Sequence, residues 1–388
     1  MWRYVLASAV LLAITLVVPR SHSTRVAIRV DCGVPGACER ARAVALDVWS
    51  EDEGPGLPLD VVVASDELPG LAAWQVLVPD IDAAARAERA RLSVARPADW
   101  FGEYRDYTAI GGYLRQLAEL APDRASVHVL GGSLEGRPLL ALRIAGAAPE
   151  ARMLVDGTQH AREWISSMVA TCVADRLVRG YASDPAIRAF VDRTELWVVP
   201  VVNPDGYQYS WAQDRYWRKN RRDRHGVDLN RNFSVAWGGP GSSSNERSQT
   251  YRGAYAFSEP ESAALRDLIR REGFSLAVDF HAYGQLVLYP WAYTRDAAPD
   301  RDRLRGIGDR MASAIFAAHE NRYALQSGAE LYPAAGTLLD FMYGDAGALS
   351  YTIELRPKSG SGFVLPPEEI RPTCDEGLAA VLALRASR

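Results

Sequence analysis

A histidine and a glutamate three residues apart, His160 and Glu163, are the residues of this chain best suited to chemistry. An imidazole nitrogen and a carboxylate oxygen are both ligands that zinc takes. The apolar stretch 153–157 before them is typical of a buried strand, and the stretch 164–178 after them is typical of a helix. Ligand groups in open α/β sheets commonly lie where a strand gives way to a helix. The pair alone is weak evidence, because a histidine near a glutamate is more often ordinary surface chemistry.

Two further residues complete a plausible metal site. His281 ends the apolar run 274–281, and Glu354 lies in the strand-like run 349–356, where a charge facing a core is not expected. Two histidines and one glutamate with an open coordination position form the ligand set of catalytic zinc peptidases. A further carboxylate close by can serve as the general base. The residues therefore predict a hydrolytic zinc site.

The chain also resembles the zinc metallocarboxypeptidases of the carboxypeptidase A/B type, the funnelins. The matching segments follow the family order: HAREWI (160–165), YWRKNRR (216–222), GVDLNRNF (226–233), FHAYGQLVLYPW (280–291) and YTIELRPKSGSGFVLPPEEI (351–370). The resemblance implies an α/β fold, with a mixed central β-sheet flanked by helices on both faces. It also implies a zinc-dependent exopeptidase with one Zn²⁺ ion, which hydrolyses the C-terminal bond of peptides and proteins.

The resemblance assigns the catalytic roles residue by residue. Zinc is expected on His160, Glu163 and His281. Glu354 is expected to take the proton from the attacking water, Arg218 to stabilise the oxyanion, and Asp228 to hydrogen-bond the first zinc histidine. The family's cis peptide after the arginine that follows the catalytic glutamate falls here at Arg356–Pro357, and X-Pro is the bond that most readily adopts cis.

A second group of residues is expected to bind the substrate. Arg231 would grip the free C-terminal carboxylate through two parallel hydrogen bonds, and Asn230 would donate to the same oxygens. Arg162 resembles the arginine that guides the carboxylate along the cleft. Tyr332, eight residues before Asp340, resembles the mobile tyrosine that closes over bound substrate.

The expected specificity depends on two positions. Leu339 matches the pocket position that is apolar in A-type and acidic in B-type enzymes, so it favours aromatic or large aliphatic C-terminal residues, since an unpaired charge there is costly. Asp279, two residues before His281, matches a small polar residue that borders the same pocket in A-type enzymes. An aspartate facing the pocket would instead favour basic C-terminal residues.

The N-terminal part of the chain indicates a secreted zymogen. Residues 1–23 read as a signal peptide, with one early arginine, an apolar run over 4–18 and small residues near the expected cleavage after Ser23. The run is shorter than a bilayer requires, and an uncleaved anchor is the alternative. The mature protein is therefore expected outside the cell or in the periplasm, with no stable membrane association.

Residues 24–96 resemble the activation prosegment of the family, which is a small α+β open sandwich. Residues 97–388 resemble the catalytic domain. Strands are predicted over 26–30, 58–64 and 74–78, and helices over 37–49 and 81–92. An activating trypsin-like protease would cleave after an arginine of the connecting helix: Arg86, Arg89, Arg91 or Arg96. The alternative is an independent N-terminal module that is never removed.

Charge and cysteines add further expectations. The formal net charge of −4 gives the chain no electrostatic reason to bind nucleic acid. A solvated face or an RNA patch is the alternative for the basic run 215–224, but the run has no matching basic partner elsewhere in the sequence, so no nucleic-acid binding is expected. In a secreted chain cysteines can pair. Cys32 and Cys38 are close enough to close a small loop. Cys172 and Cys374 are either a second pair or buried free thiols.

Two other functions stay open at this point. An inactive homologue used as a binding module would be expected to lack a zinc ligand, the base or the oxyanion arginine, and none of these is missing. A relative that acts on cell-wall peptides needs no aromatic pocket. The Asn230–Arg231 pair argues against internal cleavage, but it does not exclude an unusual C-terminal residue.

Overall fold

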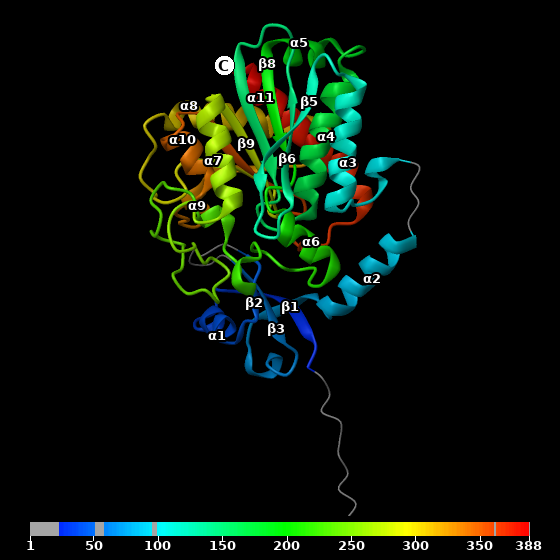
Figure 1. The fold of residues 1–388 in the computed structure, drawn as a ribbon. Helices are drawn as coiled ribbons and strands as arrows, with labels where there is room; N and C mark the ends of the chain where they lie inside the picture. Colours follow the sequence, from blue (N-terminus) through cyan, green and yellow to red (C-terminus); the bar gives the residue numbers. More distant parts are fainter. Residues whose placement is uncertain (1–22, 51–57, 95–98, 361, 388) are drawn as a thin grey trace, which may run out of the picture.

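The computed structural model describes residues 23–50, 58–94, 99–360 and 362–387. The predicted signal peptide, apart from Ser23, and Arg96 lie outside these residues. The described chain forms a small N-terminal domain that lies against one end of a much larger domain (Figure 1). Each domain is built on its own β-sheet. Within the described residues, no helix is long and apolar enough to cross a membrane.

The small domain is a four-stranded antiparallel sheet in the order β2-β3-β1-β4. Its strands are β1 (Arg25–Val30), β2 (Asp47–Val48), β3 (Leu59–Ala64) and β4 (Trp74–Val78), and its helices are α1 (Ala37–Val44) and α2 (Ile81–Val94). Cys32 and Cys38 form a disulfide beside α1. The strands predicted over 26–30, 58–64 and 74–78 and the helix over 81–92 are confirmed.

The helix predicted over 37–49 is wrong in its second half. The helix ends at Val44, and Asp47 and Val48 instead form a short edge strand against Val62 and Val61 of β3. Pairing with β3 satisfies backbone groups that the helix would otherwise have bonded. The change of direction carries the Asp47 side chain to the large domain.

The large domain is built on an eight-stranded mixed sheet, in the order β11-β10-β12-β9-β7-β8-β6-β5. Its strands are β5 (Ala125–Gly132), β6 (Pro138–Ile144), β7 (Ala151–Gly157), β8 (Thr194–Val199), β9 (Leu276–Ala282), β10 (Leu286–Tyr289), β11 (Ala324–Ser327) and β12 (Leu349–Leu355). The central strands β8, β7, β9 and β12 run parallel. Parallel strands of this kind are buried on both faces.

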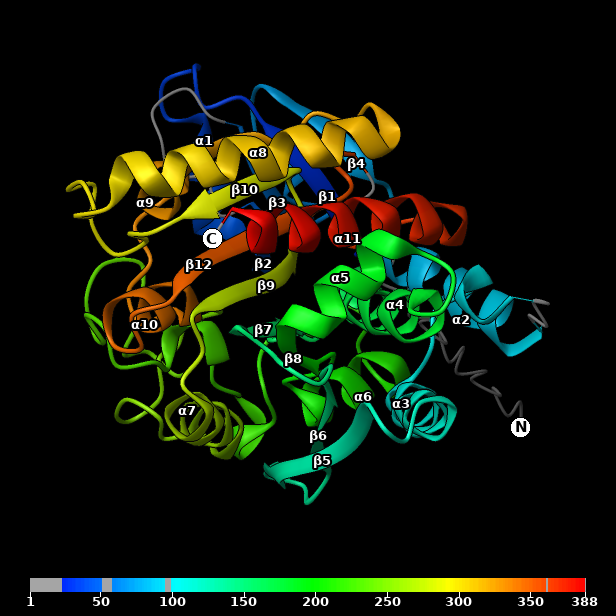
Figure 2. The same ribbon diagram turned by 90° about the horizontal axis from the view of Figure 1, so that it is seen from above.

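Helices cover both faces of this sheet (Figure 2). One face carries α3 (Tyr107–Leu120), α4 (Trp164–Gly180), α5 (Pro185–Arg193), α8 (Arg301–His319) and α11 (Ile370–Ala386), and the other carries α7 (Pro260–Glu272) and α10 (Leu338–Gly344). Side chains of β7 point alternately to the two faces of the sheet. Met153 and Val155 pack against the face covered by α4 and α11, and Leu154 packs against the face covered by α7 and α10. The predicted fold class is confirmed.

The large domain contains a disulfide and a cis peptide bond that bear on the predictions. A disulfide between Cys172 and Cys374 joins α4 to α11, so these cysteines are not free thiols. The Arg356–Pro357 peptide is cis, as predicted. Because β7, β9 and β12 are parallel, their carboxyl ends meet at one edge of the sheet, and the site is built at that edge.

Candidate active site

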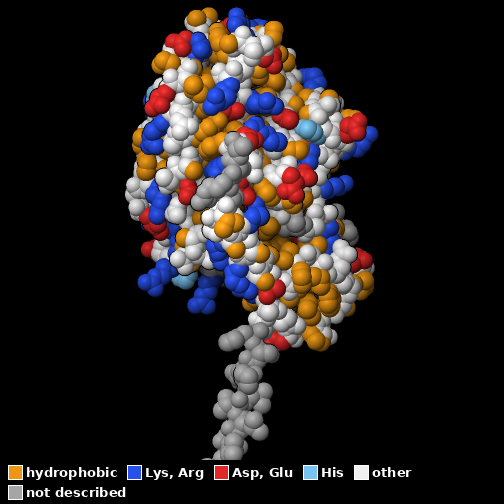
Figure 3. Space-filling model, turned by 90° about the vertical axis from the view of Figure 1, so that its right-hand side faces the viewer, with side chains coloured by type: hydrophobic (Ala, Val, Ile, Leu, Met, Phe, Trp, Pro, Cys, Tyr) orange, Lys and Arg blue, Asp and Glu red, His pale blue; other side chains and the backbone are white. Residues whose placement is uncertain are grey.

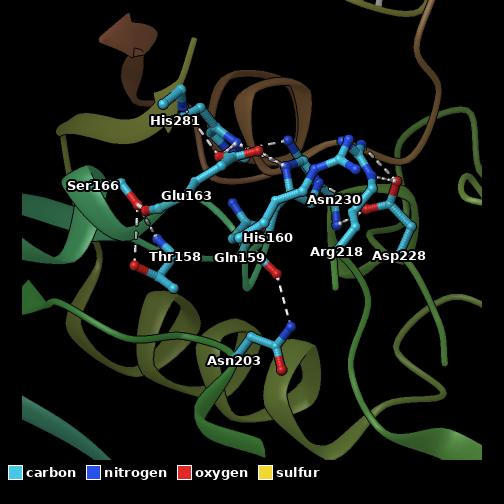
Figure 4. Close-up of polar contacts among 12 residues, drawn as sticks. Thr158, Gln159, His160, Glu163, Ser166, Asn203, Arg218, Asp228, Asn230 and His281 are labelled. Carbon is cyan, nitrogen blue, oxygen red and sulfur yellow. Dashed lines mark hydrogen bonds and ion pairs between the residues drawn. The ribbon is translucent and has the colours of Figure 1, made fainter. Parts of the chain in front are cut away.

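Two imidazoles and one carboxylate converge after β7 and at the end of β9 (Figure 4). His160 Nδ1 lies 2.8 Å from Glu163 Oε1, His281 Nδ1 lies 3.0 Å from Glu163 Oε2, and the two Nδ1 atoms are 3.1 Å apart. All three side chains are buried, and their ligand atoms lie within 4.8 Å of one another. Two nitrogens and a carboxylate oxygen aimed at one point fit the ligand set of a catalytic zinc ion.

A carboxylate contacts the outer nitrogen of each imidazole. His160 Nε2 lies 3.0 Å from Asp228 Oδ1, and His281 Nε2 lies 3.0 Å from Asp279 Oδ2. When each Nε2 donates to its carboxylate, each Nδ1 directs a lone pair to the shared point. Burial raises the pKa of Asp228, but the charges of Arg218 and His160 outweigh burial and hold it well below its ordinary value.

A guanidinium and a second carboxylate flank the ligand cluster. Arg218 Nη2 donates to Asp228 Oδ2 at 2.9 Å, which fixes the arginine beside the site. Glu354 on β12 pairs in register with His281 on β9, so it lies at the same end of the sheet. Arg218, Glu354 and Glu163 line a common cleft of about 380 Å³ between the two domains. A guanidinium and a second carboxylate thus share the cleft with the metal ligand Glu163.

The predicted carboxylate clamp is held rigidly by the backbone. Arg231 Nε donates to the carbonyl of Gly241 at 2.9 Å, and Nη1 donates to the carbonyl of Asn230 at 2.8 Å. Its Nη2 donates to the hydroxyl of Tyr332 at 3.0 Å. The Leu338 amide donates to Asn230 Oδ1 at 2.9 Å, which leaves the Asn230 amide nitrogen turned toward the ligand cluster.

The clamp and the ligand cluster share one small cavity of about 30 Å³. Its polar lining comprises His160, His281, Glu354, Asn230, Arg231, Thr337, Thr352 and the hydroxyl-bearing Tyr332. Its apolar side is formed by Leu288, Ala334 and Leu339, which pack together. Leu339 therefore lies where the sequence places it. The neighbouring Leu338 packs instead into the core with the apolar side chains of α7.

The prediction that Asp279 faces the pocket is wrong. Its side chain is buried and does not line the cavity. Asp279 Oδ2 instead accepts a hydrogen bond from Gln159 Nε2 at 2.9 Å and contacts His281 Nε2. Residues i and i+2 of a strand point to the same face, so Asp279 turns to the metal histidine of its own strand. Sequence reasoning missed Gln159, whose amide carries no sequence signal for this role.

The small domain lies over the entrance to the site. Arg162 Nη1 donates to Asp47 Oδ2 at 2.7 Å and its Nη2 donates to the Val48 carbonyl at 3.3 Å. The Arg162 guanidinium also lies over the ring of Phe363, 4.1 Å from its centroid. The predicted carboxylate-guiding arginine thus already holds a carboxylate, and that carboxylate belongs to the small domain.

Helix α2 makes a second such contact. Glu88 Oε2 accepts from Arg215 Nε at 2.5 Å, and both side chains are almost fully buried, at 2% and 1% exposure. Arg215 also donates to the carbonyls of Arg162 and Phe363, each at 2.7 Å. The basic run 215–224 is therefore partly interior.

The surface charge is mixed in sign on the face of the molecule that Figure 3 draws, where Lys and Arg side chains are interspersed with Asp and Glu.

Sequence reasoning missed Asp47, Glu88 and the burial of Arg215. A signal for Glu88 was present, because Ile81, Ala85 and Glu88 have the spacing of one helix face and are the buried residues of α2. A charged residue on the apolar face of a helix indicates a buried partner. Asp47 had no comparable signal, because its position depends on the pairing of β2 with β3.

The sequence pattern of the zinc carboxypeptidase family matches residues 110–380. The chain belongs to this family. It is a metallocarboxypeptidase, a hydrolase that acts on peptide bonds. Carboxypeptidase A1 of Mus musculus is 29% identical over 368 residues, which cover 89% of this chain and 88% of the relative. Carboxypeptidase B2 of Bos taurus is 34% identical over 322 residues, which cover 79% of this chain and 76% of the relative.

The solved structures agree with the fold. The crystal structure of thrombin activatable fibrinolysis inhibitor aligns with a TM-score of 0.86 and 28% identity, and the alignment covers 94% of this chain and 98% of that chain. The match therefore extends over the small domain as well as the large one. The metal ligands that the sequence predicts are brought together in a site of the kind that a zinc carboxypeptidase needs.

Proposed function

We propose that this protein is a secreted zinc exopeptidase that removes the C-terminal residue of peptides and proteins, and that it is made as a zymogen. One observation carries the exopeptidase assignment. The metal histidines, Glu354 and Arg231 line one and the same cavity. A substrate carboxylate bound at Arg231 would therefore lie beside the metal ligands, with the last peptide bond nearest to them. Cleavage is then expected at the last peptide bond.

Each reactive group has a defined task in this proposal. A single zinc ion on His160, Glu163 and His281 would supply Lewis acidity and lower the pKa of a bound water. Glu354 would accept the proton of the attacking water and deliver it to the leaving amine. Arg218, fixed by Asp228, would hold its guanidinium at the developing oxyanion, and a fixed donor of this kind is worth about 3 kcal/mol.

Substrate binding would follow from the clamp. Arg231 presents Nη2 to the cavity, where Tyr332 now occupies it. The C-terminal carboxylate would displace the tyrosine hydroxyl, and Asn230 would donate to the same group. Two parallel hydrogen bonds from a guanidinium select a carboxylate over an amide. The clamp thus favours free C-termini over internal sites.

An apolar specificity pocket supports a preference for aromatic or large aliphatic C-terminal residues. Leu339, Leu288 and Ala334 form its wall, and burying the charge of a lysine or arginine against these apolar side chains would be costly. Asp279, the one residue that favoured basic substrates, lies outside the cavity and is engaged by His281. The named relatives include both A-type and B-type carboxypeptidases, so relatedness alone does not decide this point.

The zymogen assignment rests on the small domain. Asp47 and Glu88 bind two arginines at the cleft, Arg162 and Arg215, with their carboxylates. A small domain seated in this way would exclude long substrates. Residues 24–96 would then be an activation prosegment, and a trypsin-like protease would release it by cutting in α2 or just after it. The predicted signal peptide at residues 1–23 supports secretion of this precursor.

The test is hydrolysis of two N-blocked octapeptides that differ only in their last residue, one ending in Phe and one in Arg. Each is assayed before and after limited trypsin digestion, with and without a zinc chelator. Release of Phe that requires trypsin and is lost with the chelator is the expected result. Preferential release of Arg would contradict the apolar pocket, and no release of either residue would contradict the exopeptidase assignment.

A further inference from the structure

We infer that Asp279 is a positioning residue, and that its carboxylate holds His281 in the orientation and tautomer that a zinc ion requires. The inference rests on the proposed function, because it concerns the same metal site. The sequence favoured a role for Asp279 in substrate specificity. The geometry assigns the residue instead to the second metal histidine.

The contact has the geometry of a carboxylate–histidine pair. Asp279 Oδ2 lies 3.0 Å from His281 Nε2, and the other ring nitrogen, Nδ1, faces Glu163 and His160. Asp228 contacts His160 Nε2 at the same distance. Each of the two imidazoles therefore has a carboxylate behind it and turns its Nδ1 to the ligand cluster.

A competing contact from Asn230 does not displace this arrangement. Its Nδ2 lies 3.3 Å from His281 Nε2, but Nδ2 is a hydrogen-bond donor, because Oδ1 is occupied by the Leu338 amide. If His281 Nε2 accepted from Asn230, the Asp279 carboxylate would face a lone pair at 3.0 Å. The tautomer with hydrogen on Nε2 satisfies the buried carboxylate, and that tautomer frees Nδ1 for the metal.

Asp279 is itself held in place. Gln159 Nε2 donates to the same Oδ2 atom at 2.9 Å, and Asn203 Nδ2 donates to the backbone carbonyl of Gln159 at 3.0 Å (Figure 4). This chain of hydrogen bonds runs from the loop after β8, through the turn after β7, to the metal histidine on β9. All of these side chains are buried, so solvent does not compete for the bonds.

The test is the zinc affinity of the full-length chain, measured by competition with a chromophoric chelator at neutral pH. Loss of such a supporting group typically weakens metal binding about 10- to 100-fold. We expect a loss of this size for Asp279→Ala. Asp279→Asn should lose less, because its amide oxygen can still accept from His281, and Gln159 can rotate its unpaired Oε1 toward the new amide.

Asp156→Asn is the matched control. Asp156 lies opposite Asp279 in the β7–β9 pair and is equally buried, but within the described part of the chain its carboxylate makes no hydrogen bond to a metal ligand. Asparagine has nearly the size and shape of aspartate, so the control keeps the packing at this position. The control should bind zinc within about threefold of the wild type, well inside the 10- to 100-fold range expected for a lost supporting group.

The outcomes separate this inference from the proposed function. Wild-type zinc affinity in Asp279→Ala, or an equal loss in Asp156→Asn, would overturn the positioning role while leaving the proposed function intact. If Asp279→Ala does not fold, the zinc affinities of the wild type and Asp279→Asn are compared instead. The wild type should bind zinc more tightly, and equal affinities would overturn the inference. A wild-type chain that binds zinc but releases no C-terminal residue would contradict the proposed function alone. A wild-type chain that binds no zinc would contradict both.

Discussion

Replacing Glu88 by glutamine should open the site of the uncleaved precursor. The Glu88–Arg215 pair joins α2 to the large domain, with both side chains almost fully buried. Glutamine keeps the size of the side chain but removes its charge, so Arg215 would keep two carbonyl acceptors and the Trp164 ring but lose its carboxylate partner. Removing one charge from a buried, hydrogen-bonded pair costs about 2–5 kcal/mol.

The expected size of the effect follows from this cost. A loss of about 3 kcal/mol in the docking free energy of the small domain increases the open fraction about a hundredfold, since each 1.4 kcal/mol is a factor of ten. Hydrolysis by the uncleaved chain should rise by the same factor, up to the rate of the trypsin-treated enzyme. The substrate should be an octapeptide, because the cleft left beneath the small domain measures only about 380 Å³.

Glu67→Gln is the control for this experiment, because Glu67 is an exposed carboxylate of the same domain. It should leave the rate of the precursor unchanged. The trypsin-treated forms of both variants should match the trypsin-treated wild type. If the Glu88→Gln precursor hydrolyses the octapeptide no faster than the wild-type precursor, the buried pair does not hold the site closed and the reasoning is refuted.

Three further changes give measurable outcomes. Leu339→Asp places a carboxylate in the apolar pocket, and the ratio of kcat/KM for Phe- over Arg-terminated peptides should fall about a hundredfold; an unchanged ratio would contradict the pocket assignment. Arg231→Lys removes the guanidinium fork and should raise KM for free C-termini at least about tenfold in steady-state assays, whereas an unchanged KM would argue against the clamp. Burial raises the pKa of Glu261 to about 7 from 4.5, so its stabilising contribution is complete below 4.5 and is lost as pH rises through 7. Glutamine does not ionise, so the unfolding free energy of Glu261→Gln minus that of the wild type, measured with urea, should increase by on the order of 3 kcal/mol from about pH 5 to about pH 8. A free-energy difference that stays constant with pH would contradict this prediction.

The parts of the site that the sequence could predict are those that local pattern determines. His160 and Glu163 follow an apolar strand directly, and His281 and Glu354 lie within apolar strands, so their positions at one edge of a parallel sheet follow from chain order. The fold class followed from the resemblance of several segments, in order, to the carboxypeptidase family. The strands of the small domain were likewise marked by short β-branched runs between turns.

The parts that could not be predicted depend on contacts between distant segments. Asp47 reaches Arg162 only because β2 leaves the helical path to pair with β3. The direction of the Asp279 side chain depended on which of two buried neighbours, the pocket or His281, its strand would face. Alternation along the strand places residues 279 and 281 on one face, but it does not say whether the carboxylate contacts the imidazole or the pocket, and that depends on the distant Gln159.

The most direct test of the exopeptidase assignment is mass spectrometry of one peptide in two forms, with a free C-terminal carboxylate and with a C-terminal amide, after incubation with the trypsin-treated protein and zinc. The free form should lose its last residue, ending in Phe, while the amide should stay intact because Arg231 has no carboxylate to bind. Glu354→Gln should leave both peptides unchanged. Cleavage at internal bonds, or equal trimming of the amide, would contradict the assignment.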